Sequence, residues 1–450
     1  MSVIMGLFDY FRLVSHRKFY NEKQIRKYQE KQLKKLYKFA VKNSEFYSDL
    51  YKNNKFLTLD DFYSLPTINK SIMMEHFSTL NTCGLNKEDV MIYAVEKEVN
   101  KDFYGYYKDE YVVGLSSGTS GNKGIYITTK YMTKRLPFVF LARGGFPLRS
   151  LPYRILFMLR VFSQGFEDIN SKLVSLSYLS TMENIDMVID KINDQNINIL
   201  MAPPSLVREL LPFANDITSD IKRIMTYAEV LETEDKERFE KDFNTKVIEI
   251  YQASEGQMAS ACKHGHLHIN EDLVFIELYD DQGNLITKEN VVGHKMIITN
   301  LINYAQPLLR YEMNDMVILD TKCSCGSNFR RIKKVLGRHD DLLYFTDSKQ
   351  LSKYIFPDLF VRWIIVCSEN IREFQVIQNK INEATIYLDL LSEDKEDIMQ
   401  MVKEKLYVEL ALFDIKNPVI NIEFKGITLP KNKNKYKRFV SNVIGNTNLD

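Results

Sequence analysis

The residues in this chain that are best suited to chemistry form one short loop rich in glycine and hydroxyl groups. The stretch 116–124 reads SSGTSGNKG, with three glycines, four hydroxyl side chains and one lysine. Glycines let backbone N–H groups turn toward a ligand, and hydroxyls add donors and acceptors. β-Prone runs at 111–113 and 124–129 flank the loop and predict a strand–loop–strand unit. The composition suits a loop that holds a polyphosphate, and a plain hairpin turn is the alternative for this loop taken alone.

The order of residues distinguishes this loop from the common Walker loop. The Walker pattern places Gly-Lys-Ser/Thr at the start of a helix, whereas here Lys123 precedes Gly124 and a strand follows. The stretch instead resembles the phosphate-binding signature of adenylate-forming enzymes, which include acyl-CoA synthetases, luciferases and peptide-synthetase adenylation domains. That signature reads roughly Ser/Thr-Ser-Gly-Ser/Thr-Thr-Gly-x-Pro-Lys-Gly. The resemblance implies that phosphates of a nucleotide are bound by Ser116, Ser117, Gly118, Thr119, Ser120, Gly121 and Lys123.

The chain departs from the signature at two positions. Ser120 stands where threonine is usual and keeps the hydroxyl, and Asn122 stands where proline is usual. The second change removes a constraint on φ but no ligand group.

Two later stretches resemble nucleotide-binding segments of the same superfamily. The stretch 225–230, MTYAEV, resembles the segment whose backbone lies along the adenine, which implies contacts from Ala228 and Glu229. The stretch 251–256, YQASEG, resembles the Tyr-x-x-Thr/Ser-Glu motif. The resemblance implies that Tyr251 stacks on adenine, that Ser254 touches phosphate, and that Glu255 is catalytic through Mg²⁺. An aromatic face suits a purine and a carboxylate suits a hard cation; a strand end with a polar turn is the alternative.

Two more motifs concern the ribose and the joint between domains. The stretch 309–315, LRYEMND, resembles the segment ending in the aspartate that binds the ribose hydroxyls, and an ionised Asp315 can accept hydrogen bonds from both. The stretch 337–341, GRHDD, resembles the hinge motif, in which Arg338 would reach the nucleotide and Asp340 would be the pivot. An ordinary loop carboxylate and a chance Gly-Arg-x-Asp are the alternatives.

The superfamily also has a catalytic lysine near the C-terminus, usually in a Gly-Lys pair preceded by proline. The corresponding stretch 429–439 reads LPKNKNKYKRF, and Lys435 aligns best, with Lys433 as the second choice. Asn434 replaces the usual glycine and is the next residue most tolerant of left-handed backbone. A lysine here would stabilise charge between the carboxylate and the α-phosphate. A solvated basic tail is the alternative.

Within the superfamily, the chain most resembles the phenylacetate–CoA ligase group and its capsule-locus, CapK-like relatives. The stretches 43–47 (NSEFY) and 65–70 (LPTINK) fit that group, as does the short length of the chain. The group often carries a structural metal cluster of cysteines and histidines. Two thiolates in a Cys-x-Cys turn plus a Cys/His pair suit tetrahedral Zn²⁺. We expect a structural zinc at Cys262, His268, Cys323 and Cys325, with His264 or His266 as substitutes for His268; reduced thiols and surface histidines are the alternative.

Composition narrows the class of protein further. A formal net charge of +1 over 450 residues gives no overall attraction to nucleic acid or anionic membrane. No apolar run is long enough for a transmembrane helix. The first fourteen residues lack the order of a signal peptide, and five cysteines do not make a disulfide framework. We therefore expect a cytoplasmic protein.

The elements that must position these motifs follow from hydrophobic periodicity. Helices are expected over 21–52, from about 69, over 185–193 and over 233–243, and strands over 153–159, 198–201 and 247–251. Their alternation predicts an α/β fold. After 341, strands at 372–378, 384–391 and 419–424 and a helix at 393–410 predict a compact α+β unit. We expect a large ATP- and acid-binding domain of mixed sheets and helices over 1–339 and a small mobile lid domain over 340–450.

The resemblance implies a reaction. ATP·Mg²⁺ and a small carboxylic acid would form acyl-AMP, and the resemblance to the subgroup favours an aromatic acid. The small domain would then rotate to present a thiol, most often coenzyme A. Two alternatives stay open: a carrier-protein thiol or an amine as acceptor, and a nucleotide-binding scaffold that has lost the ligase step. A homodimer is possible under each of them.

Overall fold

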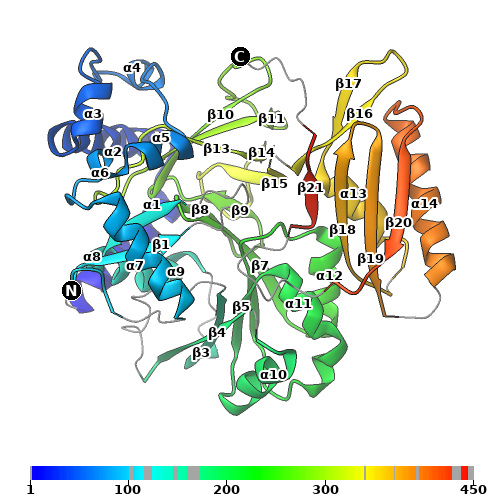
Figure 1. Cartoon of the computed structure of the whole chain (residues 1–450). Coiled ribbons are helices and arrows are strands. Elements are labelled where there is room, and N and C mark those ends of the chain that lie inside the picture. The colour runs from blue at the N-terminus through cyan, green and yellow to red at the C-terminus, as the bar shows by residue number, and fades with distance from the viewer. Residues whose placement is uncertain are drawn as a thin grey trace.

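The computed structural model describes most of the chain in two parts. The described residues are 3–100, 105–115, 124–144, 150–159, 172–181, 183–338, 341–368, 370–391, 395–427 and 437–443. Figure 1 shows the large part, 3–338, with the C-terminal part, 341–443, beside it. None of the helices in these ranges combines the length and apolar character needed to cross a membrane.

Helices make up the N-terminal segment, and polar caps fix where several of them begin. Asn21 accepts a hydrogen bond from the N–H of Gln24, and Ser44 accepts one from the N–H of Tyr47. Ser44 has extended backbone (φ −124°, ψ 120°), so two helices replace the single helix expected over 21–52. Asn69 caps the helix predicted to start there. The helices are α1 (Val3–Phe19), α2 (Glu22–Asn43), α3 (Glu45–Leu50), α4 (Leu59–Tyr63), α5 (Lys70–Glu75), α6 (Phe77–Leu80) and α7 (Lys87–Val99).

A ten-stranded sheet forms the centre of the large part. It contains β3 (Tyr153–Leu159), β4 (Val174–Ser180), β5 (Ile199–Ala202), β6 (Arg223–Thr226), β7 (Lys246–Ala253), β8 (Gly256–Ala261), β9 (Leu267–Ile269), β11 (Val292–Gly293), β14 (Asp315–Asp320) and β15 (Arg331–Arg338). The order is β11-β14-β15-β9-β8-β7-β6-β5-β3-β4. Strands from β4 to β7 are parallel, and those from β7 to β11 are antiparallel. The strands predicted at 153–159, 198–201 and 247–251 are confirmed.

Helices cover both faces of the parallel half, because its strands are apolar on both sides. On one face pack α10 (Ile185–Asp194), α11 (Pro204–Leu210), the 3₁₀ helix Leu211–Asp216 and α12 (Thr233–Asp242). On the other lies α9 (Leu136–Arg143), which follows α8 (Lys130–Thr133). This is the alternating α/β arrangement that the sequence predicted.

Two small sheets complete the large part. One is the hairpin of β1 (Tyr111–Leu115) and β2 (Ile125–Thr129), and the other contains β10 (Val274–Tyr279), β12 (Lys295–Asn300) and β13 (Tyr311–Met313). The largest core cluster joins α2, through Leu33 and Leu36, to β10 and β12. The N-terminal helices are therefore built into the large part.

The C-terminal part has its own sheet and its own core. It contains β16 (Leu343–Thr346), β17 (Ser352–Ile355), α13 (Pro357–Ile365), β18 (Ile371–Lys380), β19 (Glu383–Leu390), α14 (Lys395–Leu412), β20 (Val419–Phe424) and β21 (Phe439–Ser441). The sheet order is β20-β19-β18-β21, and one core cluster draws only on residues from Leu343 to Phe439. The predicted mixed α/β fold with a C-terminal α+β unit is confirmed. The division at 339/340 stays a prediction, since both residues lie outside the described ranges.

Candidate active site

The hairpin that carries the glycine-rich loop is present on both sides of it. Strands β1 and β2 pair antiparallel, and the pair nearest the loop is Leu115 with Ile125. The loop residues 116–123 lie outside the described ranges, as do Asp340, Lys433 and Lys435. The predicted strand–loop–strand unit is therefore confirmed at its two strands, and the roles of these residues stay predictions.

Glu255 lies directly against this hairpin. It sits with Ser254 in the turn between β7 and β8, and Ser254 is exposed. The hydroxyl of Tyr126, on β2, donates to Glu255 Oε1 at 2.6 Å and lies 3.2 Å from the hydroxyl of Tyr311. A phenol has one proton, so Tyr311 must donate to Tyr126 in turn. Burial, and then Glu255, raise the pKa of Tyr126 far above its ordinary value, which keeps the donor protonated.

A second group of side chains meets at the ends of β7, β14 and β15. The Tyr251 hydroxyl donates to Asp315 Oδ2 at 2.7 Å, and Arg338 Nε donates to Asp315 Oδ1 at 3.3 Å. Asp315 and Arg338 are also directly opposed in the β14–β15 ladder. Burial opposes the charge on Arg338, but Asp315 outweighs it and raises the pKa of the guanidinium. Arg338 also feels the charge of Glu255, so the two groups share one electrostatic site.

The segment proposed to lie along adenine has an unusual backbone. Ala228 adopts φ +66°, a left-handed conformation that is uncommon for alanine. The next side chain, Glu229, accepts hydrogen bonds from the N–H of Ser205 at 3.0 Å and from its Oγ at 2.9 Å. The start of α11 thus fixes this turn in place.

One basic residue near the site was not singled out from the sequence. Burial lowers the pKa of Lys70, the attraction of Glu255 opposes this, and Arg338 adds to the lowering. Lys70 is the first residue of α5, so its position follows from the Asn69 cap. The only signal in the sequence was its place in the stretch 65–70, to which the resemblance gave no chemical role.

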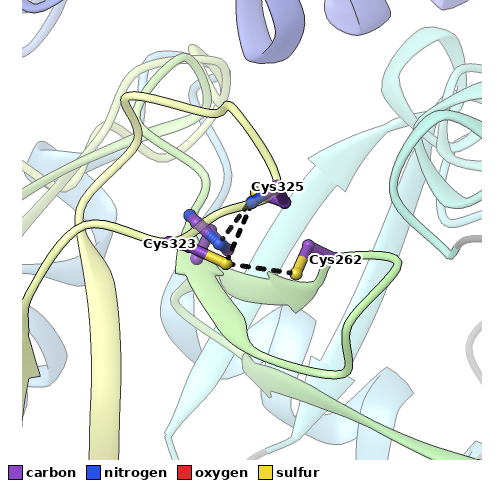
Figure 2. Close-up of side chains that lie close together, drawn as sticks. Cys262, Cys323 and Cys325 are labelled. Carbon is purple, nitrogen blue, oxygen red and sulfur yellow. Dashed lines mark hydrogen bonds between the residues drawn. The ribbon is translucent and has the colours of Figure 1, made fainter.

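The four expected zinc ligands come together from the β8–β9 turn, strand β9 and the loop before β15, and Figure 2 shows the three cysteines among them close together. The ligand atoms of Cys262, His268, Cys323 and Cys325 all lie within 4.8 Å of one another. Cys262 Sγ is 3.8 Å from Cys323 Sγ, and Cys325 Sγ is 3.5 Å from His268 Nε2. Tetrahedral Zn²⁺ with bonds of about 2.3 Å to sulfur and 2.0–2.1 Å to nitrogen separates such pairs by about 3.8 and 3.5 Å. The donor set therefore fits the metal.

The protonation of His268 fits the same role. Its Nδ1 lies 2.9 Å from the carbonyl oxygen of Phe329, which directs Nε2 toward the thiols. Burial lowers the pKa of His268 to about 4, against the effect of that carbonyl, so the ring is neutral at neutral pH. Of the two substitutes, His266 lies 3.2 Å from Cys323 Sγ, whereas His264 lies 3.1 Å from Ser324 Oγ.

Comparison with known proteins finds relatives by sequence and by structure. No family model matches the chain. It is 24% identical over 440 residues to protein CapK of Staphylococcus aureus, covering 92% of this chain and 89% of that protein. It is 24% identical over 159 residues to phenylacetate-coenzyme A ligase of Thermus thermophilus, covering 35% and 32%.

A solved 2-hydroxyisobutyryl-CoA ligase shares the fold. In its postadenylation state, in complex with 2-HIB-AMP, it superposes with a TM-score of 0.70 at 13% identity, over 95% of this chain and 91% of that one. The same ligase in its thioesterification state superposes over the same shares with a TM-score of 0.56 at 14% identity.

Proposed function

We propose that the chain is a member of the superfamily of adenylate-forming acyl-CoA ligases, and that it activates a small carboxylic acid with ATP and transfers the acyl group to a thiol. Coenzyme A is the proposed acceptor. The acid to test first is phenylacetate, because the sequence resembles phenylacetate–CoA ligases, and 2-hydroxyisobutyrate is the second, because the ligase of similar fold acts on it.

One observation carries the proposal. Glu255, Asp315 and Arg338, which are far apart in the sequence, share one electrostatic site beside the β1–β2 hairpin. Two carboxylates and a guanidinium next to a glycine-rich loop supply opposite charges for a nucleotide: the cation for phosphate, and the carboxylates for a metal ion and for ribose hydroxyls. An ion pair with only a structural role would consist of Asp315 and Arg338 alone. It would include neither Glu255 nor a position beside the β1–β2 hairpin.

The first half-reaction forms acyl-AMP. An oxygen of the substrate carboxylate attacks the α-phosphorus, the bond from that phosphorus to the bridging oxygen breaks, and pyrophosphate leaves. Asp315 accepts hydrogen bonds from the ribose, and Tyr251 and Arg338, which already contact Asp315, hold its carboxylate in place. Glu255 would be the protein's oxygen ligand for Mg²⁺, which would neutralise phosphate charge, and Tyr126 fixes the orientation of that carboxylate.

The second half-reaction forms the thioester. The thiol sulfur attacks the acyl carbon, the carbon–oxygen bond to AMP breaks, AMP leaves with the electron pair, and the thiol proton passes to solvent. Enzymes of this kind move a small domain between the two steps. The better superposition on the postadenylation state than on the thioesterification state supports an arrangement suited to the first step.

We assign a structural zinc to the cysteine–histidine cluster. Four protein ligands leave no coordination position for a substrate, and the cluster is built from the β8–β9 turn, strand β9 and the loop before β15. Its proposed role is to tie these segments together.

ATP–pyrophosphate exchange tests the function. The folded protein, with MgATP and labelled pyrophosphate, is expected to exchange label only when a suitable acid is present, in a panel of phenylacetate, 2-hydroxyisobutyrate and other aryl and short-chain acids. An Asp315→Ala variant that folds normally is expected to lose most of the exchange. If the wild type exchanges with no acid in the panel, the proposed function is rejected.

A further inference from the structure

Four charged side chains, three of them buried and one partly buried, meet where the C-terminal part contacts the large part. Arg208 on α11 and Asp235 on α12 belong to the large part, and Glu373 on β18 and Arg438, just before β21, belong to the C-terminal part. Their side chains are between 3% and 15% exposed. Two cations and two anions make the cluster neutral as a whole.

Each part contributes a complete ion pair. Arg208 donates to Asp235 from Nε at 3.2 Å and from Nη2 at 2.6 Å. Arg438 donates to Glu373 from Nε at 2.8 Å and from Nη2 at 3.0 Å. Both are two-point arginine–carboxylate pairs, the geometry that fixes orientation most strongly. A single further bond, from Arg208 Nη1 to Glu373 Oε2, joins the two pairs across the contact.

This division has an energetic consequence. Removing one partner of a buried ion pair is costly because it leaves a charge without compensation. Separating the two parts here breaks only the Arg208–Glu373 bond, and each charge keeps the partner on its own part. The contact can therefore close and open without leaving a buried charge unpaired. If each part contributed only one charge, opening the contact would leave both charges without a partner.

Helix α11 connects this contact to the turn at Ala228 and Glu229. Ser205, one turn before Arg208, holds Glu229 in the segment proposed to lie along adenine. On the other side, Arg438 follows the proposed catalytic Lys435 by three residues in the sequence. The Arg208–Glu373 bond thus joins elements that belong to the two halves of the proposed site.

We propose that Arg208 and Glu373 are positioning residues for the adenylate-forming half-reaction: their bond holds the C-terminal part in the arrangement that serves this step, and it breaks when that part moves for thioester formation. This inference rests on the proposed function. The charges required are present at neutral pH. Burial opposes ionisation of Glu373, but Arg208 and Arg438 outweigh it and keep the pKa of its carboxyl below the ordinary value.

Two variants and a matched control test the proposal. Arg208→Lys keeps a cation beside Asp235 but removes the fork that reaches Glu373, and Glu373→Gln removes the charge on the other side. Arg143→Lys is the control, because Arg143 is equally buried and pairs with Asp272 inside the large part. Three quantities are compared with the wild type: pyrophosphate exchange with the best acid of the panel, thioester formation from the chemically prepared adenylate of that acid plus coenzyme A, and hydrogen–deuterium exchange of amides in 206–210 and 371–378.

The expected pattern separates the two half-reactions. Loss of a hydrogen bond between charged groups should slow pyrophosphate exchange by about 10- to 100-fold in both variants. Thioester formation from the prepared adenylate should stay at the wild-type rate or rise, and amide exchange should increase at the contact. Arg143→Lys should affect pyrophosphate exchange and thioester formation to the same extent, and it should leave amide exchange at the contact unchanged.

Two results would overturn the inference. One is wild-type pyrophosphate exchange in both variants; the other is an equal loss of both half-reactions together with unchanged amide exchange at the contact. If the wild type exchanges with no acid, the proposed function fails separately, and the amide exchange alone then decides whether this bond holds the two parts together.

Discussion

At the scale of single residues, the sequence predicted the charged groups Glu255, Asp315 and Arg338 of the candidate site but not the tyrosine that orients Glu255. Glu255, Asp315 and Arg338 stand in motifs, whereas Tyr126 lies 129 residues before Glu255 and in no motif. Only the pairing of β1 with β2 and the turn after β7 bring the two together. Hydrogen bonds between distant residues depend on the tertiary fold, so the sequence alone could not show them.

The Tyr126 hydroxyl gives a direct test of how Glu255 is oriented. Tyr126→Phe removes the donor 2.6 Å from the carboxylate, and a hydrogen bond to a charged group is worth about 1.5–3 kcal/mol. We expect kcat/KM for MgATP to fall by roughly 10-fold or more and the Mg²⁺ concentration for half-maximal activity to rise. Tyr304→Phe is the control, because the Tyr304 hydroxyl has no hydrogen-bond partner within the described residues. Equal kinetics of the two variants would refute the assignment.

The catalytic lysine is a second prediction at this scale. Lys435→Ala is expected to reduce pyrophosphate exchange by roughly 100-fold or more, because it removes a cation from the charge that develops at the α-phosphate. Lys433→Ala, two residues away, should retain most of the exchange. The reverse result would assign the role to Lys433, and normal exchange in both variants would remove the lysine from the mechanism.

At the scale of elements, periodicity predicted most helices and strands well, and local capping explains an exception. The residues 21–52 have a continuous helical pattern, yet Ser44 ends α2 and caps α3. A serine in a long amphipathic run is compatible with either outcome, because its side chain can cap or face solvent. Pairing between strands was beyond the sequence, as in the sheet order that places β15 beside β9.

Metal content tests the proposed link between the β8–β9 turn and the loop before β15. Protein purified without chelator is expected to carry zinc at about one ion per chain, as a closed four-ligand site requires. Cys325→Ser should lose the zinc and unfold at lower temperature, since binding of the metal contributes to folding. Cys367→Ser, in the C-terminal part and outside the cluster, should keep it. Full zinc content in Cys325→Ser would exclude this ligand set.

Glu249, in the middle of β7, predicts a pH dependence of stability. Burial raises the pKa of Glu249 from 4.5 to about 7, against the Leu231 backbone and Lys236. The folded state thus holds this proton more tightly than the unfolded state. The stability that the protonated group gives is full below about pH 4.5 and is lost as the pH rises to about 7.

Urea unfolding at pH 5 and pH 8 checks this sign. The free energy of unfolding of Glu249→Gln, minus that of the wild type, should increase from pH 5 to pH 8 by up to about 3 kcal/mol. Glu237, on the exposed side of α12, provides the control. The free energy of unfolding of Glu237→Gln should differ from that of the wild type by the same small amount at pH 5 and at pH 8. A Glu249→Gln variant whose advantage does not grow with pH would contradict the shift.

At the scale of the whole molecule, the two parts meet through charges that no motif contained. Arg208 and Asp235 are 27 residues apart, whereas Glu373 lies 165 residues after Arg208, so the cluster exists only once both parts have folded. The sequence predicted two parts from a change of pattern near 340, but not how they contact each other. The same contact relates the turn at Ala228 and Glu229, through α11, to the strand that follows Lys435.

The origin of the oxygen in released AMP tests the central claim, carboxylate attack on the α-phosphorus, most directly. The acid that supports exchange is labelled with oxygen-18 in its carboxylate and incubated with ATP, Mg²⁺ and coenzyme A, and the AMP is analysed by mass spectrometry. We predict AMP that carries one labelled oxygen, together with pyrophosphate and the thioester. Unlabelled AMP, or ADP and phosphate in its place, would contradict the mechanism.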